Sequence, residues 1–323
     1  PPPPPPPPPA PAPPPHTPPR PPPPPGDCTD PATTEIYTRA HQGVTVQTSA
    51  GNHGALNATI AAGLSTEKLS FSASADGSRL RGYSAPDATG KRDASQSDSL
   101  RMGVTFTPID TLKLRFDAAN SQIDTRYAGP LTQSQFDANP AQNGGKTYAH
   151  QTLDSEQWRL GGDFWLTPSL KLSATHGRED RRSRFLAPFV YGADYNNAFS
   201  DLALQYDAEA LNLVVGAQQF DGERLGSSGR TTKNNLAVFV QGLYRLGKTS
   251  LSAGARSETV DYRYASTATT REDTHRLSGW DIGINRRIDD SLTLFANYNS
   301  AYQAPDVDRF FHWDGSFNTF IKP

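Results

Sequence analysis

The sequence predicts an all-β protein: an antiparallel up-and-down transmembrane β-barrel, of which the chain holds only a part. Two observations predict this class. Apolar and polar residues alternate with a period of two in one segment after another from residue 44 onward, as they do in strands with two different faces. The connections between these segments are alternately short and long. Outer-membrane barrels have tight turns at one end and long loops at the other.

The composition agrees with this class and excludes several others. The chain has 323 residues, a net charge of −2 and 35% hydrophobic residues, which is a low apolar content for a soluble domain. This charge gives no basic footprint for a nucleic-acid partner. The longest clear apolar run is residues 236–240, far below the ~18 residues of a transmembrane helix. Cys28 is the only cysteine, so we expect neither a disulfide framework nor a cysteine metal cluster.

Residues 1–34 form a separate, proline-rich region. Residues 1–25 contain 20 of the 29 prolines, and such a tract adopts only polyproline II structure because proline fixes φ and donates no backbone hydrogen bond. A rigid spacer or a ligand for a polyproline-binding domain would suit this composition. We expect instead that the segment is disordered or not native to the protein, since a translocated protein should begin with a signal sequence and none is recognisable.

The alternating segments number roughly thirteen, which is more strands than one ordinary sandwich holds. The clearest apolar positions are Leu69, Phe71, Ala73 and Ala75; Leu112, Leu114, Phe116 and Ala118; Leu170, Leu172 and Ala174; and Leu251, Ala253 and Ala255. Polar residues such as Lys113 and Arg115 stand between them. In a wide membrane barrel the apolar face meets lipid and the polar face lines the lumen. We therefore expect Leu114 and Arg115 to point to opposite sides of the sheet.

The connections fall into two sets. The short set lies at residues 64–67, 107–110, 167–169, 207–209, 246–248 and 288–290, and most of its members carry turn-forming residues. The long, polar set is predicted at residues 77–98, 120–155, 178–197, 221–233 and 262–274. The first connection on the long side, residues 51–54, is short as well. A secreted sandwich would have no reason to keep its long loops at one end, so the alternation favours the membrane barrel.

Aromatic residues support the same orientation. Phe106, Trp165, Tyr206 and Tyr244 each lie just before a short turn, where an interfacial aromatic girdle would lie. Aromatic residues also favour strands in general. We predict such a girdle at the short-turn end.

Four short motifs lie at the two ends of the alternating region. They are Glu35-Ile36-Tyr37-Thr38-Arg39, residues 44–54, residues 292–306 with Ala301-Tyr302-Gln303-Ala304-Pro305, and residues 317–323. In this order they resemble the last plug strand, the first barrel strand with its G-S-x-G turn, the "Y-x-x-A-Y-R-A-P" strand and the "N-P-x-L-K-P-E" segment of TonB-dependent receptors. The resemblance assigns residues 35–43 to the end of the plug domain and residues 44–323 to part of the β-barrel.

The resemblance implies a receptor in the outer membrane of a Gram-negative bacterium that takes up a ferric siderophore or cobalamin. The TonB complex would act through the plug domain, and outer-membrane lipid would surround the barrel. The family barrel has 22 strands, so roughly nine strands would follow Pro323, and the TonB box and most of the plug are not found before Glu35. We therefore expect a truncated fragment that is inactive alone.

Two other classes could account for an all-β chain of this kind. An autotransporter translocator barrel can follow a proline-rich linker. Against it, the chain ends in Lys322-Pro323 instead of a strand with a terminal aromatic residue, and roughly thirteen strands exceed the dozen or so of that class. A secreted all-β adhesin would leave the alternation of short and long connections unexplained.

The sequence contains no catalytic constellation, so we predict no enzyme, no cofactor and no metal site. Asp76, Asp87 and Asp93 lack the ligand spacing of a calcium loop. The densest arginine–aromatic cluster lies in the predicted loop at residues 178–197 and consists of Arg178, Arg181, Arg182, Arg184, Tyr191 and Tyr195. Guanidinium and phenol groups suit an anionic, aromatic siderophore by charge pairing and stacking. We predict a ligand site in this loop; a solvated loop whose charges compensate one another is the alternative.

Overall fold

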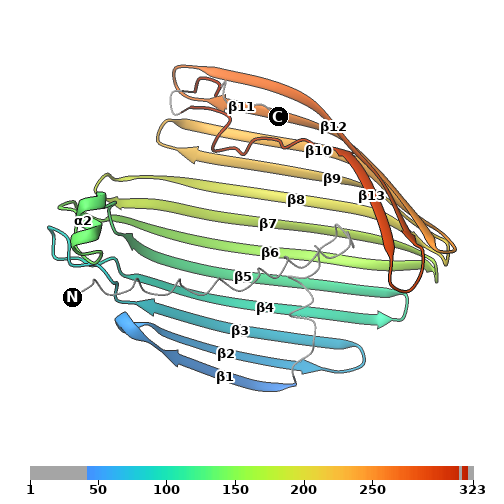
Figure 1. Ribbon diagram of the computed structural model, residues 1–323, viewed down its shortest axis with the longest axis horizontal. Coiled ribbons are helices and arrows are strands. Elements are labelled where there is room, and N and C mark those ends of the chain that lie inside the picture. Colours follow the sequence, from blue (N-terminus) through green and yellow to red (C-terminus); the bar gives the residue numbers. More distant parts are fainter. Residues whose placement is uncertain (1–41, 313–314, 319–323) are drawn as a thin grey trace, which may run out of the picture. The chain divides into compact units, whose positions relative to one another are not determined.

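The described residues of the computed structural model, 42–312 and 315–318, form one antiparallel sheet whose strands follow one another in chain order (Figure 1). The chain divides into two units, residues 1–39 and 40–323. The predictions for residues 1–34 and for most of residues 35–43 fall outside the described part, which begins at Gln42. The all-β, up-and-down class predicted from the sequence is confirmed.

The sheet has thirteen strands, as the alternating segments indicated. Their bounds are β1 (Gly43–Ala50), β2 (Leu56–Ser65), β3 (Leu69–Leu80), β4 (Ser95–Ile109), β5 (Leu112–Tyr127), β6 (Ala149–Thr167), β7 (Leu170–Ala187), β8 (Tyr191–Asp207), β9 (Leu211–Gly226), β10 (Gly229–Leu246), β11 (Thr249–Ala265), β12 (Thr270–Arg287) and β13 (Thr293–Ser300). Two short helices, η1 (Asn52–Gly54) and α2 (Gln133–Ala138), lie in connections. Neither helix has the length and apolar character needed to cross a membrane.

The predicted short turns all lie at one end of the sheet. Each strand runs antiparallel to the one before it, so the connections that follow even-numbered strands share an end. Local chemistry closes these turns: Gly247 has a φ of +59°, and Asp289 accepts hydrogen bonds from the N–H groups of Ser291 and Leu292 at 2.8 and 2.9 Å. The hydroxyl of Ser291 donates to Asp289 as well, at 2.8 Å. This hydrogen bond first, and then those of the N–H groups, hold the pKa of Asp289 below its usual value.

The connections at the other end are shorter than the sequence predicted. They span residues 81–94, 128–148, 188–190, 227–228 and 266–269. The strands therefore continue through most of the predicted loops, and this part of the prediction was wrong. Beyond the apolar band both faces of a strand carry polar side chains, so the period-2 signal disappears although the hydrogen-bonded ladder goes on.

The register separates an apolar face from a polar face. Residues directly opposite one another in an antiparallel pair share a face. Leu112, Phe164 and Leu172 are successive partners across β5, β6 and β7. The five leucine and phenylalanine positions predicted to share a face therefore do so: Leu112, Leu114, Phe116, Leu170 and Leu172. Many side chains on this apolar face are open to their surroundings, and Leu202 is 51% exposed.

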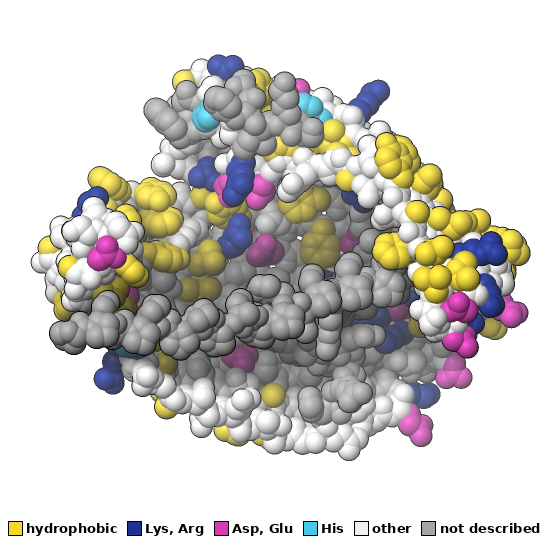
Figure 2. Space-filling view, in the orientation of Figure 1, with side chains coloured by type: hydrophobic (Ala, Val, Ile, Leu, Met, Phe, Trp, Pro, Cys, Tyr) yellow, Lys and Arg dark blue, Asp and Glu magenta, His cyan; other side chains and the backbone are white. Residues whose placement is uncertain are grey.

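The polar face is continuous across seven strands. Its successive partners from β5 to β11 are Arg115, Gly161, Thr175, Asp201, Gln218, Ala237 and Glu258. Arg115 forms an ion pair of 2.5 Å with Asp163, whose side chain is only 9% exposed. Figure 2 looks onto the hollowed side of the sheet, where basic and acidic side chains lie within the hollow. Along the apolar band, charge is thus gathered on the polar face, where paired groups satisfy one another.

Three of the four residues predicted to form an aromatic girdle lie on the apolar face. Phe106, Tyr206 and Tyr244 lie opposite Leu114, Leu170 and Leu251 on the apolar face. Trp165 instead lies opposite Lys171 on the polar face, with the Lys171 ammonium 5.8 Å from its ring centroid. Trp165 lies in the same register as Gly161 and Asp163 of the polar face, so the prediction that it shares a face with the other three was wrong.

Two long connections, residues 81–94 and 128–148, are hydrogen-bonded to each other. Asp87 accepts a hydrogen bond from the N–H of Tyr148 at 2.9 Å, and the Tyr148 hydroxyl donates to the carbonyl of Ala85 at 2.8 Å. Asp87 also accepts from the hydroxyl of Thr89 and from the N–H of Lys91. These hydrogen bonds, that of the Thr89 hydroxyl first among them, hold the pKa of Asp87 well below its usual range.

An arginine on the apolar face should prevent assembly, whereas an arginine at the same depth on the polar face should not. Leu202 lies opposite Ala174, and the neighbouring Thr175 lies opposite Asp201 on the polar face. In a full-length barrel, Leu202→Arg should cost ~2–4 kcal/mol near the bilayer midplane, while Thr175→Arg gains Asp201 as a partner. The measurement is heat-modifiable migration and the urea midpoint in vesicles. Equal loss with both substitutions would show that the two faces are not distinct.

Loss of the Asp87 carboxylate should release residues 128–148. Asp87→Ala should raise hydrogen–deuterium exchange in this segment, and Asp137→Ala, which removes an exposed carboxylate of α2, should not. Because the folded pKa of Asp87 is lowered, its contribution is present above the usual carboxyl pKa and is lost only as the pH falls through the lower folded value. The wild-type segment should therefore stay protected at neutral pH and open in strong acid. An unchanged exchange rate in Asp87→Ala would contradict this role.

Candidate ligand-binding site on the polar face

The predicted arginine–tyrosine cluster lies in strands and not in a loop. Its four arginines, Arg178, Arg181, Arg182 and Arg184, belong to β7, and Tyr191 and Tyr195 belong to β8. Only residues 188–190 connect the two strands. The alternation is hidden here because acidic residues stand between the arginines and both faces are polar.

The register divides the cluster between the two faces. Arg181 lies opposite Tyr195 on the polar face. Tyr191 shares that face and stacks on Phe185, with 4.5 Å between the ring centroids. The other three arginines, Arg178, Arg182 and Arg184, lie on the opposite face. Two of them are paired there, with Asp180 at 3.0 Å and Asp194 at 2.5 Å. The six residues predicted to form one ligand site are therefore divided, and only Arg181, Tyr191 and Tyr195 share the polar face.

On the polar face two further residues join Arg181 and Tyr195. The guanidinium carbon of Arg181 lies 4.4 Å from the ring centroid of Tyr195. The Tyr195 hydroxyl donates to both carboxylate oxygens of Asp308, at 3.1 and 3.2 Å. Arg224 lies opposite Tyr195 in β9, and its Nε is 2.7 Å from Oδ1 of Asp308. We call Arg181, Tyr195 and Arg224 the anion site, since it presents two guanidinium groups and a phenol to the same space.

Sequence reasoning missed Arg224 and Asp308. Arg224 lies in a stretch predicted as loop, and its position beside Tyr195 follows only from the β8–β9 register. Asp308 comes from residues 301–312 and 315–318, which we call the strap and which follow β13. In Figure 1 the strap runs back across the strands that precede it. No local spacing signals these contacts.

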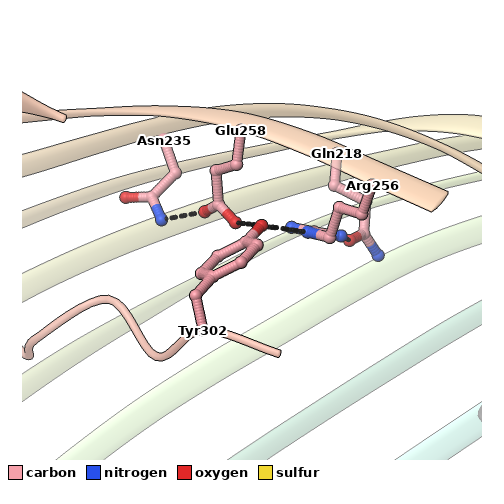
Figure 3. Close-up of polar contacts among 5 residues, drawn as sticks. All are labelled: Gln218, Asn235, Arg256, Glu258 and Tyr302. Carbon is pink, nitrogen blue, oxygen red and sulfur yellow. Dashed lines mark hydrogen bonds and ion pairs between the residues drawn. The ribbon is translucent and has the colours of Figure 1, made fainter. Parts of the chain in front are cut away.

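The start of the strap is held by a polar network (Figure 3). The Tyr302 hydroxyl donates to Glu258 at 2.5 Å and accepts from Nε of Arg256 at 3.0 Å. Asn235 donates to the other carboxylate oxygen of Glu258 at 2.5 Å, and Arg256 also donates to Gln218. Glu258 is only 6% exposed. A carboxylate this buried needs partners for both oxygens, and the strap supplies one of them.

An aromatic cluster holds the rest of the strap against β11. Its buried aromatic members are Tyr262, Tyr264, Phe310 and Phe311, and the aliphatic Val260 is buried with them. The rings of Tyr262 and Phe310 stack with 3.8 Å between centroids, and the Tyr262 hydroxyl donates to the carbonyl of Pro305 at 2.7 Å. The strap therefore packs on the polar face through its own apolar core.

The described residues present no metal centre. No group of three or more histidine, cysteine, aspartate or glutamate side chains in residues 42–312 and 315–318 is placed to hold an ion. The three aspartates considered for calcium have separate partners. Asp76 accepts from the hydroxyl of Thr59 at 2.8 Å, Asp93 accepts from the N–H of Ser84 at 2.8 Å, and Asp87 joins the two long connections.

Known proteins share this architecture. Residues 37–323 match the sequence profile of the family described as "TonB dependent receptor-like, beta-barrel". A search of curated proteins found no match. Among solved structures, the chain is similar to the ferric-catecholate import receptor Fiu from E. coli K12, with a TM-score of 0.66, 9% identity, and coverage of 83% of this chain and 55% of Fiu.

Two more receptor structures are similar to the same extent. The alcaligin outer membrane receptor FauA from Bordetella pertussis gives a TM-score of 0.65 and 15% identity, covering 85% of this chain and 45% of FauA. The ferric yersiniabactin uptake receptor FyuA from Yersinia pestis gives 0.62 and 12%, covering 80% and 47%. At these identities the likeness concerns the fold alone, and the chain spans about half the length of these receptors.

The profile match covers the whole described sheet and replaces the autotransporter and adhesin alternatives. Proteins of this family are β-barrels of the Gram-negative outer membrane, which is where this chain is located. The sheet, its one-sided short turns and the family match lead to one assignment. The chain belongs to the TonB-dependent receptor family and forms part of its outer-membrane β-barrel.

Proposed function

We propose that the whole protein takes up an anionic iron chelate, a ferric siderophore, with energy supplied through the TonB complex. The observation that carries the proposal is the anion site on the polar face, near the end where the long connections lie. In outer-membrane barrels the polar face lines the lumen and the long connections are extracellular. A ligand arriving from outside would meet this end first.

The chemistry of the anion site suits a carboxylate or catecholate ligand. A guanidinium pairs with two oxygens at once, and a phenol ring stacks on an aromatic group. The side chain of Arg224 is 29% exposed, so a ligand can reach it. The similar structures include a ferric-catecholate importer and a ferric yersiniabactin receptor. The two guanidinium groups suit an anionic chelate better than cobalamin, the other ligand expected from the sequence.

We propose that the thirteen strands form a closed barrel only together with further strands. Within the described sheet β1 and β13 each pair with one neighbour only, and unpaired backbone groups along such edges are costly in a bilayer. Barrels of this family have 22 strands. We propose that additional strands close the barrel, that its apolar face contacts outer-membrane lipid and that a plug domain links it to TonB. The thirteen-stranded unit alone should not transport.

Neutralising Arg181 should weaken binding of an anionic chelate, whereas neutralising Arg182 should not. The two residues are neighbours on β7 and lie on opposite faces, so they form a matched pair. In the full-length receptor, Arg181→Gln should weaken binding of ferric tris-catecholate roughly fivefold, as expected of ~1 kcal/mol from a partly exposed charge. Calorimetry in detergent measures the affinity, and radioactive iron uptake measures transport.

A neutral ferric trihydroxamate is the control ligand, and its affinity should not depend on Arg181. If Arg181→Gln and Arg182→Gln bind the anionic chelate as tightly as wild type, the polar face does not recognise the anion. If both lose affinity equally, the assignment of faces is wrong.

A further inference from the structure

We infer that Asp308 is a tethered carboxylate that occupies the anion site, and that an anionic ligand must displace it. The inference rests on the proposed function and adds how the site is regulated. The hydroxyl of Tyr195 donates its proton to the carboxylate of Asp308, within reach of both oxygens, and Asp308 forms an ion pair with Arg224. These are the contacts that the carboxylate of a ligand would make. The strap thus brings to the anion site a group of the same charge as the ligand.

Asp308 satisfies the anion site only in part. The 2.7 Å contact between Nε of Arg224 and Oδ1 of Asp308 lacks hydrogen-bond geometry, and this buried Nε has no hydrogen-bond partner. Nε of Arg181 is also buried without a hydrogen-bond partner, and the guanidinium group of Arg181 lies over the ring of Tyr195. Asp308 thus leaves the Nε atoms of both arginines without a hydrogen bond. A planar chelate with several anionic oxygens could pair with both.

The strap can release Asp308 without unfolding. Its other main contacts are made to β11, through Tyr302 with Glu258, Pro305 with Tyr262, and Phe310 with the aromatic cluster. Asp308 instead reaches across to β8 and β9. Its side chain is 38% exposed, so solvent and ligand can approach it. Displacement would free the middle of the strap while both of its anchors stay in place.

Competition of this kind lowers the apparent affinity. When a protein group occupies the site for part of the time, the apparent Kd rises by the inverse of the fraction that is open. A half-exposed ion pair is worth little, so the effect should be small. Removing the charge of Asp308 should tighten binding of an anionic chelate about two- to fivefold.

The test uses the full-length receptor with Asp308→Asn, and Asp306→Asn as the matched control. Asp306 lies in the same strap but accepts a hydrogen bond from the N–H of Val307, and asparagine keeps this acceptor. Without ligand, Asp308→Asn should raise hydrogen–deuterium exchange at residues 306–310, and Asp306→Asn should not. Ferric tris-catecholate should bind Asp308→Asn more tightly than wild type. The same chelate should raise exchange of the strap in wild type.

Two results would overturn the inference while the proposed function stands: chelate binding that depends on Arg181 but is weaker or unchanged in Asp308→Asn, or chelate that lowers exchange of the wild-type strap. Either would show that Asp308 positions the arginines and does not compete with the ligand. If the chelate binds none of the variants, nor the wild type, the proposed function and the inference both fail. Tighter binding by Asp308→Asn together with a more mobile strap supports displacement.

Discussion

The pairing of backbone N–H and C=O groups between neighbouring strands is the constraint on which this structure depends. Inside a bilayer no water can replace these hydrogen bonds, so every strand must lie beside another strand. The chain meets this demand in the simplest way, with each strand from β2 to β12 paired to its predecessor and its successor in sequence. Once the ladder is set, successive side chains of a strand point to opposite faces. The face of each side chain therefore follows from its parity, that is, from whether its position along the strand is odd or even.

Parity explains why the polar face can hold charges at all. Arg115 and Asp163 are directed to the same side as Thr175 and Glu258, away from the band of leucines. Charges at the same depth on the other side would meet lipid at a cost of ~2–4 kcal/mol each. The same parity brings Arg181, Tyr195 and Arg224 together from three adjacent strands. The anion site is therefore a consequence of register, and the strap then packs across it.

Most of the fold could be predicted from the sequence, because strands that cross a bilayer must alternate. Leu112, Leu114 and Phe116 show this alternation plainly, and the short turns near Pro108, Pro168 and Gly247 are marked by turn-forming residues. The strand ends beyond the apolar band could not be predicted, since neither face is apolar there. The predicted loop at residues 178–197 is therefore mostly β7 and β8.

The site could be predicted only in part for the same reason. A dense run of arginines drew attention to Arg181 and Tyr195, but parity sends Arg182 and Arg184 to the other face. Arg224 and Asp308 reach the site through strand register and through a segment that folds back from beyond β13. Contacts between residues this far apart leave no pattern in one sequence. The sequence showed that Ala301-Tyr302-Gln303-Ala304-Pro305 resembles a motif of the family barrel. The structure adds that Tyr302 contacts Glu258 and that Pro305 contacts Tyr262.

The central claim is that the apolar face meets lipid and the polar face lines the lumen. It is tested most directly by single cysteines at residues 201–206 of β8 in a full-length barrel, each carrying a nitroxide label in a lipid bilayer. Leu202, Leu204 and Tyr206 lie on the apolar face, and residues 201, 203 and 205 lie on the polar face. Labels at the even positions should collide with oxygen dissolved in lipid, and labels at the odd positions with a water-soluble nickel chelate. A reversed phase, or no alternation between the two reagents, would contradict the claim.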